Sequence, residues 1–161
     1  MANLKQIEKH LKSDKLPYKI IDLGGEVFTV EGVKETGVLE DEIVKTLIIR
    51  VNGNPSISGI SGSIRFVALA IRGKDRVDFK KIRKLFGSKS GLARADEVEK
   101  VVKVPVGAVC PILLDIPLIF DRRIMDLKRV HMGSGDLTKG LEMDFADLLK
   151  AVGEYQIEDL V

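Results

Sequence analysis

The sequence has few of the side chains that hold metal ions or form disulfides. Its 161 residues include one cysteine, Cys110, two histidines and no tryptophan. A single cysteine excludes an intramolecular disulfide and a cysteine-rich metal cage, and it is typical of a reducing compartment. There is no His-x-x-x-His pair, so the usual soft ligands of zinc are missing as well. We therefore expect no metal, no other cofactor and a cytoplasmic location.

The chain also lacks long apolar runs and a strong net charge. No stretch reaches the roughly 18 consecutive apolar residues of a membrane-spanning helix, and the first residues do not resemble a signal peptide. The 26 basic and 24 acidic side chains leave a net charge of +2. This charge is too small to indicate nucleic-acid binding by itself. Any nucleic-acid site has to be a local patch, and we expect no membrane contact.

What is present favours one compact α/β domain over residues 1–161. Hydrophobic side chains make up 45% of the chain and charged ones 31%, which is enough for a real core. Residues from Glu154 onward are expected to form a loose tail or a partner-dependent extension. Asn52-Gly53-Asn54-Pro55 indicates a hairpin whose two flanking strands pair. Thr29, Asp78 and Asp144 are candidate helix caps. Apolar spacing predicts helices over 4–11, 29–33, 40–42, 79–86, 95–101 and 145–150, and strands over 18–23, 44–51, 64–71, 117–121, 127–132 and 139–143.

A candidate site combines an apolar loop with one lysine. Gly107 and Pro111 lie four residues apart in this loop. A glycine lets the backbone approach a ligand closely, and a proline fixes φ, so the loop can present a rigid rim of main-chain groups. Lys45 enters an apolar strand and adds one cation. Together they suggest a pocket for a small polar substrate that carries a phosphate.

Each of these residues also has a plainer interpretation. A lysine at a strand start is usually solvated, and Gly-x-x-x-Pro strings are common in ordinary loops. Cys110 is a small packed residue rather than a nucleophile, because neither histidine is placed by sequence as its base. His131 is either a half-buried structural histidine or a pocket donor, and both alternatives remain open.

Four segments occur in an order that is much more specific than any one of them. They are Ile43–Leu47, Asp78–Ile82, Ala93–Val98 and Pro105–Pro111, and a glycine-rich turn at 133–135 with Leu141-Glu142 closes the series. In this order the chain resembles the YbaK/prolyl-tRNA synthetase-associated domain family, the free-standing and inserted aminoacyl-tRNA deacylases that edit mischarged tRNA. The resemblance covers roughly residues 3–152. It departs from the family at 56–63, where the hairpin region is longer than usual.

The resemblance implies a fold and a site. The fold is an α/β domain whose mixed, strongly curved, barrel-like sheet is surrounded by helices. Lys45, expected near the phosphate of the terminal adenosine, Gly107 and Pro111 are the implied catalytic residues, with no metal. The implied substrate-binding residues are Thr46, Ala108, Val109, Cys110, His131, Gly133, Ser134 and Gly135.

The implied function is trans-editing deacylation of mischarged tRNA by a water that backbone groups position. The first guess for the substrate is proline tRNA charged with alanine or cysteine. The tRNA acceptor end is the expected partner, with an aminoacyl-tRNA synthetase as a further one. The alternatives are a tRNA- or synthetase-binding module that has lost hydrolysis and a hydrolase of another small ester. Two basic groups are either solvated surface or contacts to the acceptor stem: Lys80, Lys81, Arg83, Lys84, Lys89 and Arg94, and Arg122, Arg123, Lys128 and Arg129.

Overall fold

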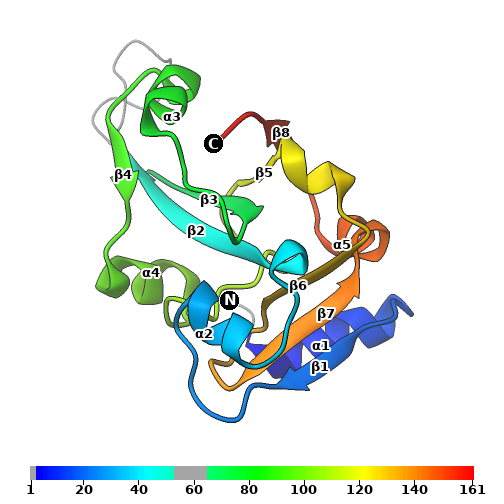
Figure 1. Cartoon of the computed structure of the whole chain (residues 1–161). Coiled ribbons are helices and arrows are strands. Elements are labelled where there is room, and N and C mark those ends of the chain that lie inside the picture. The colour runs from blue at the N-terminus through cyan, green and yellow to red at the C-terminus, as the bar shows by residue number, and fades with distance from the viewer. Residues whose placement is uncertain (1–2, 53–64) are drawn as a thin grey trace.

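Two separate β-sheets with helices around them make up the computed structural model of the chain (Figure 1). The structure describes residues 3–52 and 65–161. The strands are β1 (Lys19–Asp22), β2 (Val44–Val51), β3 (Arg65–Arg72), β4 (Ser90–Leu92), β5 (Leu118–Asp121), β6 (Arg129–Gly133), β7 (Lys139–Asp144) and β8 (Gln156–Glu158). The helices are α1 (Leu4–Ser13), α2 (Val30–Glu35), α3 (Phe79–Phe86), α4 (Ala95–Val102) and α5 (Phe145–Ala151), with short 3₁₀ helices η1 (Glu40–Glu42) and η2 (Arg122–Asp126).

The strand order confirms a mixed α/β architecture and corrects its expected shape. One sheet has the order β1-β7-β6, and the other has the order β4-β2-β3-β5-β8. Within the described residues neither sheet closes on itself, so the expected strongly curved, barrel-like sheet is wrong. The physical reason lies at the edge of β2, where β4 pairs only from Ile49 to Val51. Between β2 and the other sheet there is only a single parallel bridge, from Ile43 to His131, which is too short to make one continuous ladder.

The central pair of strands forms as the sequence predicts. β2 and β3 run antiparallel, with Val44 opposite Arg72 and Val51 opposite Arg65. The Gly53-Asn54-Pro55 part of the predicted hairpin and the segment 56–63 lie outside the described residues. Along β2, Val44 and Ile48 pack into a core cluster shared with the three-stranded sheet, whereas Ile49 and Val51 pack into a second cluster beneath α3. The strand is therefore buried on both faces.

Helix caps explain where two of the predicted helices begin. The Thr29 side chain accepts a hydrogen bond from the Gly32 N–H at 3.1 Å, and the Asp78 side chain accepts one from the Lys80 N–H at 2.9 Å. Asp144 makes no such cap bond to α5. Its carboxylate accepts a hydrogen bond from Arg129 at 3.0 Å instead.

The expected loose tail is instead the edge of the larger sheet. β8 pairs in parallel with β5, and Leu160 is completely buried. The Leu160 N–H donates to Asp121 at 2.9 Å, and Asp159 forms ion pairs with Lys81 and Arg123, each at 2.9 Å. Hydrogen bonds from Lys81 and Arg123 lower the pKa of Asp159 to about 2. These long-range contacts fix the segment, and none of them leaves a local pattern in the sequence.

Candidate functional site

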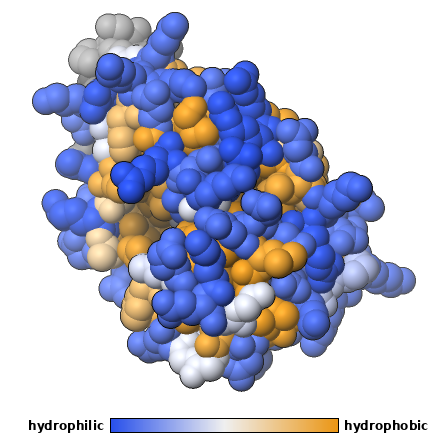
Figure 2. Space-filling model, viewed as in Figure 1, coloured by the Kyte–Doolittle hydropathy of each residue, from blue (hydrophilic) through white to orange (hydrophobic). Residues whose placement is uncertain are grey.

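A cavity of about 320 Å³ lies beside the free edge of β2. Its walls come from β2, β6, the segment before α2, the Gly107 loop and the start of α4. In Figure 2, apolar surface shows in a hollow on this face of the molecule, bordered by hydrophilic residues. The lining is mostly aliphatic, with a few polar groups placed among the apolar ones. Concave, mainly apolar sites with a few convergent polar groups are typical of small-ligand binding.

The edge of β2 turns main-chain groups toward this cavity. Ile48 O accepts a hydrogen bond from Ala93 N at 2.9 Å, on the side away from β3. Backbone groups alternate sides along a strand, so the N–H and C=O of Thr46 point the same way. The Thr46 hydroxyl oxygen is buried and has no hydrogen-bond partner in the described part of the chain. The cavity wall at Thr46 therefore offers both backbone and side-chain polar groups.

Backbone hydrogen bonds hold the Gly107 loop at Ala108, but none is formed within the described residues by the N–H groups on either side. Ala108 N donates to Pro105 O at 3.0 Å, and Ala108 O accepts from Gly135 N at 2.7 Å. The N–H groups of Gly107 and Val109 have no partner among residues 3–52 and 65–161, and both residues line the cavity. The two hydrogen bonds of Ala108 thus hold the loop between two residues whose N–H groups are unpaired within the described part of the chain.

Two glycines are required by close packing around this loop. Gly107 has φ +92°, which glycine alone adopts readily, and a β-carbon there would lie 2.8 Å from Phe28 O. At Gly133 a β-carbon would collide with the Val109 carbonyl oxygen. The loop, the segment before α2 and β6 therefore fit together only because these positions lack side chains.

Lys45 lies at the mouth of the cavity and is half-buried. Its ammonium group donates a hydrogen bond to Gly73 O at 3.2 Å. Burial lowers the pKa of Lys45, the nearby Arg76 lowers it further, and Asp75 opposes both effects. Arg76 is exposed and has no ion-pair partner in the described part of the chain. Lys45 therefore has a second cation near it, Arg76, which does not itself line the cavity and which the sequence did not single out.

His131 is buried against the cavity and is only 2% exposed. Neither ring nitrogen has a hydrogen-bond partner within the described residues, although Nδ1 lies 3.6 Å from a Glu142 carboxylate oxygen. Burial lowers the pKa of His131, and Glu142 partly opposes this. A β-carbon at Gly140 would collide with the imidazole, so that glycine makes room for the ring. The histidine is thus both packed and placed at the cavity wall.

The structure brings together only part of the set expected from the sequence. Lys45, Thr46, Gly107, Val109, His131 and Gly133 line the cavity, whereas Ala108, Cys110, Pro111, Ser134 and Gly135 do not. Cys110 is 4% exposed, and burial raises the pKa of its thiol to about 12. The Ser134 hydroxyl donates to Lys139 O at 2.7 Å and holds the turn. Gly135, at φ +89°, lies against the start of α1.

Sequence reasoning missed Phe28, which lines the cavity, and Arg76, which lies near Lys45. Phe28 lines the cavity and is 54% exposed. Both residues lie in connecting segments far along the chain from the Gly107 loop. No periodicity or motif marks them, so only the folded structure could reveal them.

The described residues contain neither a metal-binding cluster nor a membrane-spanning helix. No group of three or more His, Cys, Asp or Glu side chains there is arranged to hold a metal ion. No helix in the same residues is long and apolar enough to cross a membrane.

The chain is a mixed α/β protein with a cavity whose lining includes two residues, Gly107 and Val109, with main-chain N–H groups that are unpaired within the described residues. The sequence model of the aminoacyl-tRNA editing domain matches residues 25–151, and the chain belongs to this family. The resemblance that we inferred from four segments is thereby confirmed.

Several relatives and solved structures are similar to the chain. Proline–tRNA ligases of Legionella pneumophila strains Corby and Paris are each 30% identical over 105 residues, which are 64% of this chain and 17% of the ligase. The chain thus spans about a sixth of the length of these relatives. A crystal structure of a hypothetical protein has 32% identity and a TM-score of 0.78, covering 96% of this chain and 97% of that one. A structure described as a candidate trans-editing enzyme for prolyl-tRNA synthetase has a TM-score of 0.76 at 21% identity, covering 98% and 95%, and shares the fold.

Proposed function

We propose that this protein is a trans-editing deacylase that hydrolyses the ester between a wrongly attached amino acid and the terminal ribose of a tRNA. The observation that carries the proposal is the cavity wall, where the unpaired N–H groups of Gly107 and Val109 lie in one site with the unpaired Thr46 hydroxyl and His131. Our first choice of substrate is proline tRNA charged with alanine or cysteine. Such a tRNA is met in the cytoplasm, beside the synthetase that charges it.

The free main-chain donors suit the chemistry of ester hydrolysis. Attack of water on the ester carbonyl puts negative charge on its oxygen, and preorganised N–H groups stabilise that charge. One such donor contributes about 3 kcal/mol to the transition state. Gly107 and Val109 offer donors whose hydrogen bonds are not already used within the described residues. The ester is already activated, so water held in place is a sufficient nucleophile.

A cysteine nucleophile fits the structure poorly. Cys110 packs in the core cluster instead of lining the cavity, and its thiol pKa is raised to about 12 by burial. A thiol with that pKa holds almost no thiolate at neutral pH, and the thiolate is the reactive form. The burial of Cys110 thus supports water as the attacking group in the proposed reaction.

The unpaired polar side chains suit the remaining parts of the substrate. A buried polar group without a partner costs about 1–3 kcal/mol, and a ligand that supplies the partner recovers this cost. The Thr46 hydroxyl and the neutral His131 ring can form hydrogen bonds with the amino group of the attached amino acid or with a ribose hydroxyl. The cavity, about 320 Å³, is at the small end of ligand sites, which favours a small amino-acid side chain.

Lys45 in the cavity wall and the neighbouring Arg76 suit the phosphates of the tRNA end. Lys45 and Arg76 are close enough for the charge of one to lower the pKa of the other. The repulsion between two like charges is offset when an anion lies between them. We therefore assign Lys45 to phosphate binding.

The test is a deacylation screen with purified protein. Proline tRNA charged with alanine, cysteine or proline is incubated with the protein, alongside alanine tRNA correctly charged with alanine. We expect hydrolysis of one wrongly charged proline tRNA and sparing of the two correctly charged ones. Tight tRNA binding without hydrolysis of any charged tRNA would instead support the non-catalytic binding module. Hydrolysis of simple amino-acid esters alone would support a different small-ester hydrolase.

A further inference from the structure

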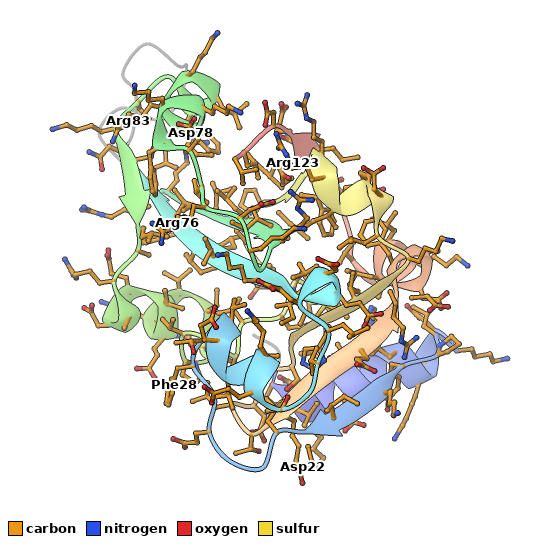
Figure 3. All side chains as sticks on the ribbon, viewed as in Figure 1. Asp22, Phe28, Arg76, Asp78, Arg83 and Arg123 are labelled. Atoms are coloured by element: carbon orange, nitrogen blue, oxygen red, sulfur yellow. The ribbon has the colours of Figure 1, made fainter. Side chains whose placement is uncertain are left out.

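Phe28 is the single exposed phenylalanine of the chain. All six phenylalanines lie in the described residues, and the other five are buried or partly buried. Phe28 is 54% exposed and lines the cavity. Figure 3 shows its side chain beside the start of α2. Leaving an aromatic ring in water sacrifices the stabilisation that its burial brings, so this position calls for an explanation.

The backbone that carries Phe28 is held in place on both sides. Val27 N donates to Leu137 O at 2.9 Å, and Thr29 caps α2 through its bond to the Gly32 N–H. The Phe28 carbonyl group packs directly against Gly107. An exposed ring on a fixed backbone presents a flat apolar face at little cost in lost conformational freedom.

The surroundings of the ring fit a nucleotide. Val106 and Leu92 also line the cavity and are 42% and 58% exposed, so the mouth is apolar on this side. Lys45 lines the same cavity, and Arg76 lies near it without an ion-pair partner among the described residues. A nucleotide combines a flat apolar base with an anionic phosphate. A ring and a lysine that line one cavity, with a second cation near the lysine, complement both parts.

We propose that Phe28 is a positioning residue on which the terminal adenine of the tRNA stacks. This inference rests on the proposed function. The ester lies at the N–H groups of Gly107 and Val109, and the ribose joins the ester to the base. Phe28 lines the cavity and packs its backbone on Gly107, so it lies close to the loop at which we place the ester. Stacking there holds the flexible end of the tRNA so that its ester stays over the main-chain donors.

The first test separates a flat ring from an apolar contact. Stacking on an aromatic side chain changes binding about 5-fold to 140-fold per base. We expect Phe28→Ala to lower kcat/KM on charged tRNA within this range, mainly through KM, and Phe28→Tyr to restore it. Phe28→Leu keeps apolar volume without a planar face and should not restore it. Leu39→Ala, at a side chain that is 65% exposed and does not line the cavity, is the matched control.

A substrate without a nucleobase distinguishes stacking by Phe28 from a merely structural role. The methyl ester of the same amino acid keeps the scissile bond and lacks the nucleotide. We expect Phe28→Ala to lose much less activity on this ester than on charged tRNA, because the ester has no base to stack. Equal loss on the ester and on the tRNA would overturn the stacking role, because the variant would then have a damaged site.

Fluorescence provides a second measurement that needs no turnover. The sequence has no tryptophan, so Phe28→Trp introduces the only one. We expect quenching when an RNA ending in CCA is added, and little quenching with the same RNA lacking its terminal adenosine. Leu39→Trp should respond to neither RNA. Equal quenching by both RNAs would overturn the inference.

The outcomes also distinguish this inference from the function on which it rests. If the unchanged protein hydrolyses no charged tRNA in the screen, the proposed function fails, whatever Phe28 does. If hydrolysis is found and Phe28→Ala matches the unchanged protein on charged tRNA, the stacking role alone fails.

Discussion

Gly107 and Phe28 lie in direct backbone contact: a β-carbon on Gly107 would come within 2.8 Å of the Phe28 carbonyl oxygen. This contact joins the loop that carries the free N–H groups to the segment that forms the mouth of the cavity. The two residues are far apart in the sequence, and a missing side chain lets them meet. The site therefore depends on the exact backbone path at Gly107.

We expect Gly107→Val to abolish most deacylation. A β-branched residue at φ +92° is strained and collides with Phe28, which displaces the main-chain donors. Loss of one such donor costs about 100-fold to 1,000-fold in kcat, and the strain costs about 1–3 kcal/mol of stability. Single-turnover deacylation and thermal unfolding of the variant measure the two effects. Gly91→Ala is the matched control, because a β-carbon there meets no atom within 4 Å.

We expect Lys45→Ala to weaken deacylation while the fold persists. The side chain makes one hydrogen bond, to Gly73 O, and it is only half-buried, so its removal leaves little unsatisfied. A charge-assisted contact to phosphate is worth about 1.5–3 kcal/mol, which corresponds to about 10-fold to 150-fold in KM. Lys9→Ala, at an exposed residue of α1, controls for the loss of one positive charge. Unchanged turnover in a folded Lys45→Ala protein would remove Lys45 from the site.

Local patterns predicted those parts of the fold that short-range contacts determine. The β2–β3 pair follows from two apolar runs, and the starts of α2 and α3 follow from Thr29 and Asp78, whose side chains bond within three residues. The strand β8 depends instead on Leu160 reaching Asp121 and on Asp159 reaching Lys81. Contacts across such distances leave no periodic signal, so the segment was expected to be loose.

The candidate site likewise has a part that the sequence predicted and a part that it did not. The Gly107 loop is visible in the sequence because glycine and proline have strong backbone preferences. Phe28 and Arg76 are ordinary residues in connecting segments, and only folding brings Phe28 to the cavity and Arg76 near Lys45. The strongly curved, barrel-like sheet was expected from the family resemblance, because the sequence itself cannot show where one ladder stops. Here the β4 ladder stops at Ile49, and the cavity occupies the edge of β2 that remains.

We expect Cys110→Ala and Cys110→Ser to retain appreciable hydrolysis. Neither change removes the N–H groups of Gly107 and Val109, and the thiol lies in the core with its pKa raised to about 12. The folded protein should also resist alkylation by iodoacetamide near neutral pH, because the thiolate is scarce and buried. Circular dichroism and matched thermal transitions establish that each variant is folded. Abolished activity in folded Cys110→Ser, with a trapped aminoacyl-thioester on the unchanged protein, would make Cys110 the nucleophile.

We expect a chelator to leave deacylation unaltered. No group of three candidate ligands is arranged for a metal among the described residues, and the chain has one cysteine and two histidines in all. Activity is compared before and after EDTA treatment, and bound metal is measured by elemental analysis. Loss of hydrolysis that added zinc restores would contradict the water mechanism proposed here.

We expect His131 to make the stability of the protein depend on pH just below neutrality. Burial holds the pKa of the folded-state imidazole below its usual value of 6.5, with Glu142, 3.6 Å away, as the opposing carboxylate. As the pH falls through about 6.5, the unfolded chain therefore takes up the proton before the folded one does. The stability tied to the neutral ring is present above this pH and is lost below it. His131→Asn removes the titrating group while keeping a polar side chain of smaller size. Urea unfolding at pH 7.5, 6.5 and 5.5 should show that the unchanged protein loses more free energy of unfolding than the variant does. Equal losses would mean that His131 titrates alike in the folded and unfolded chains, and that the cavity wall does not keep it neutral.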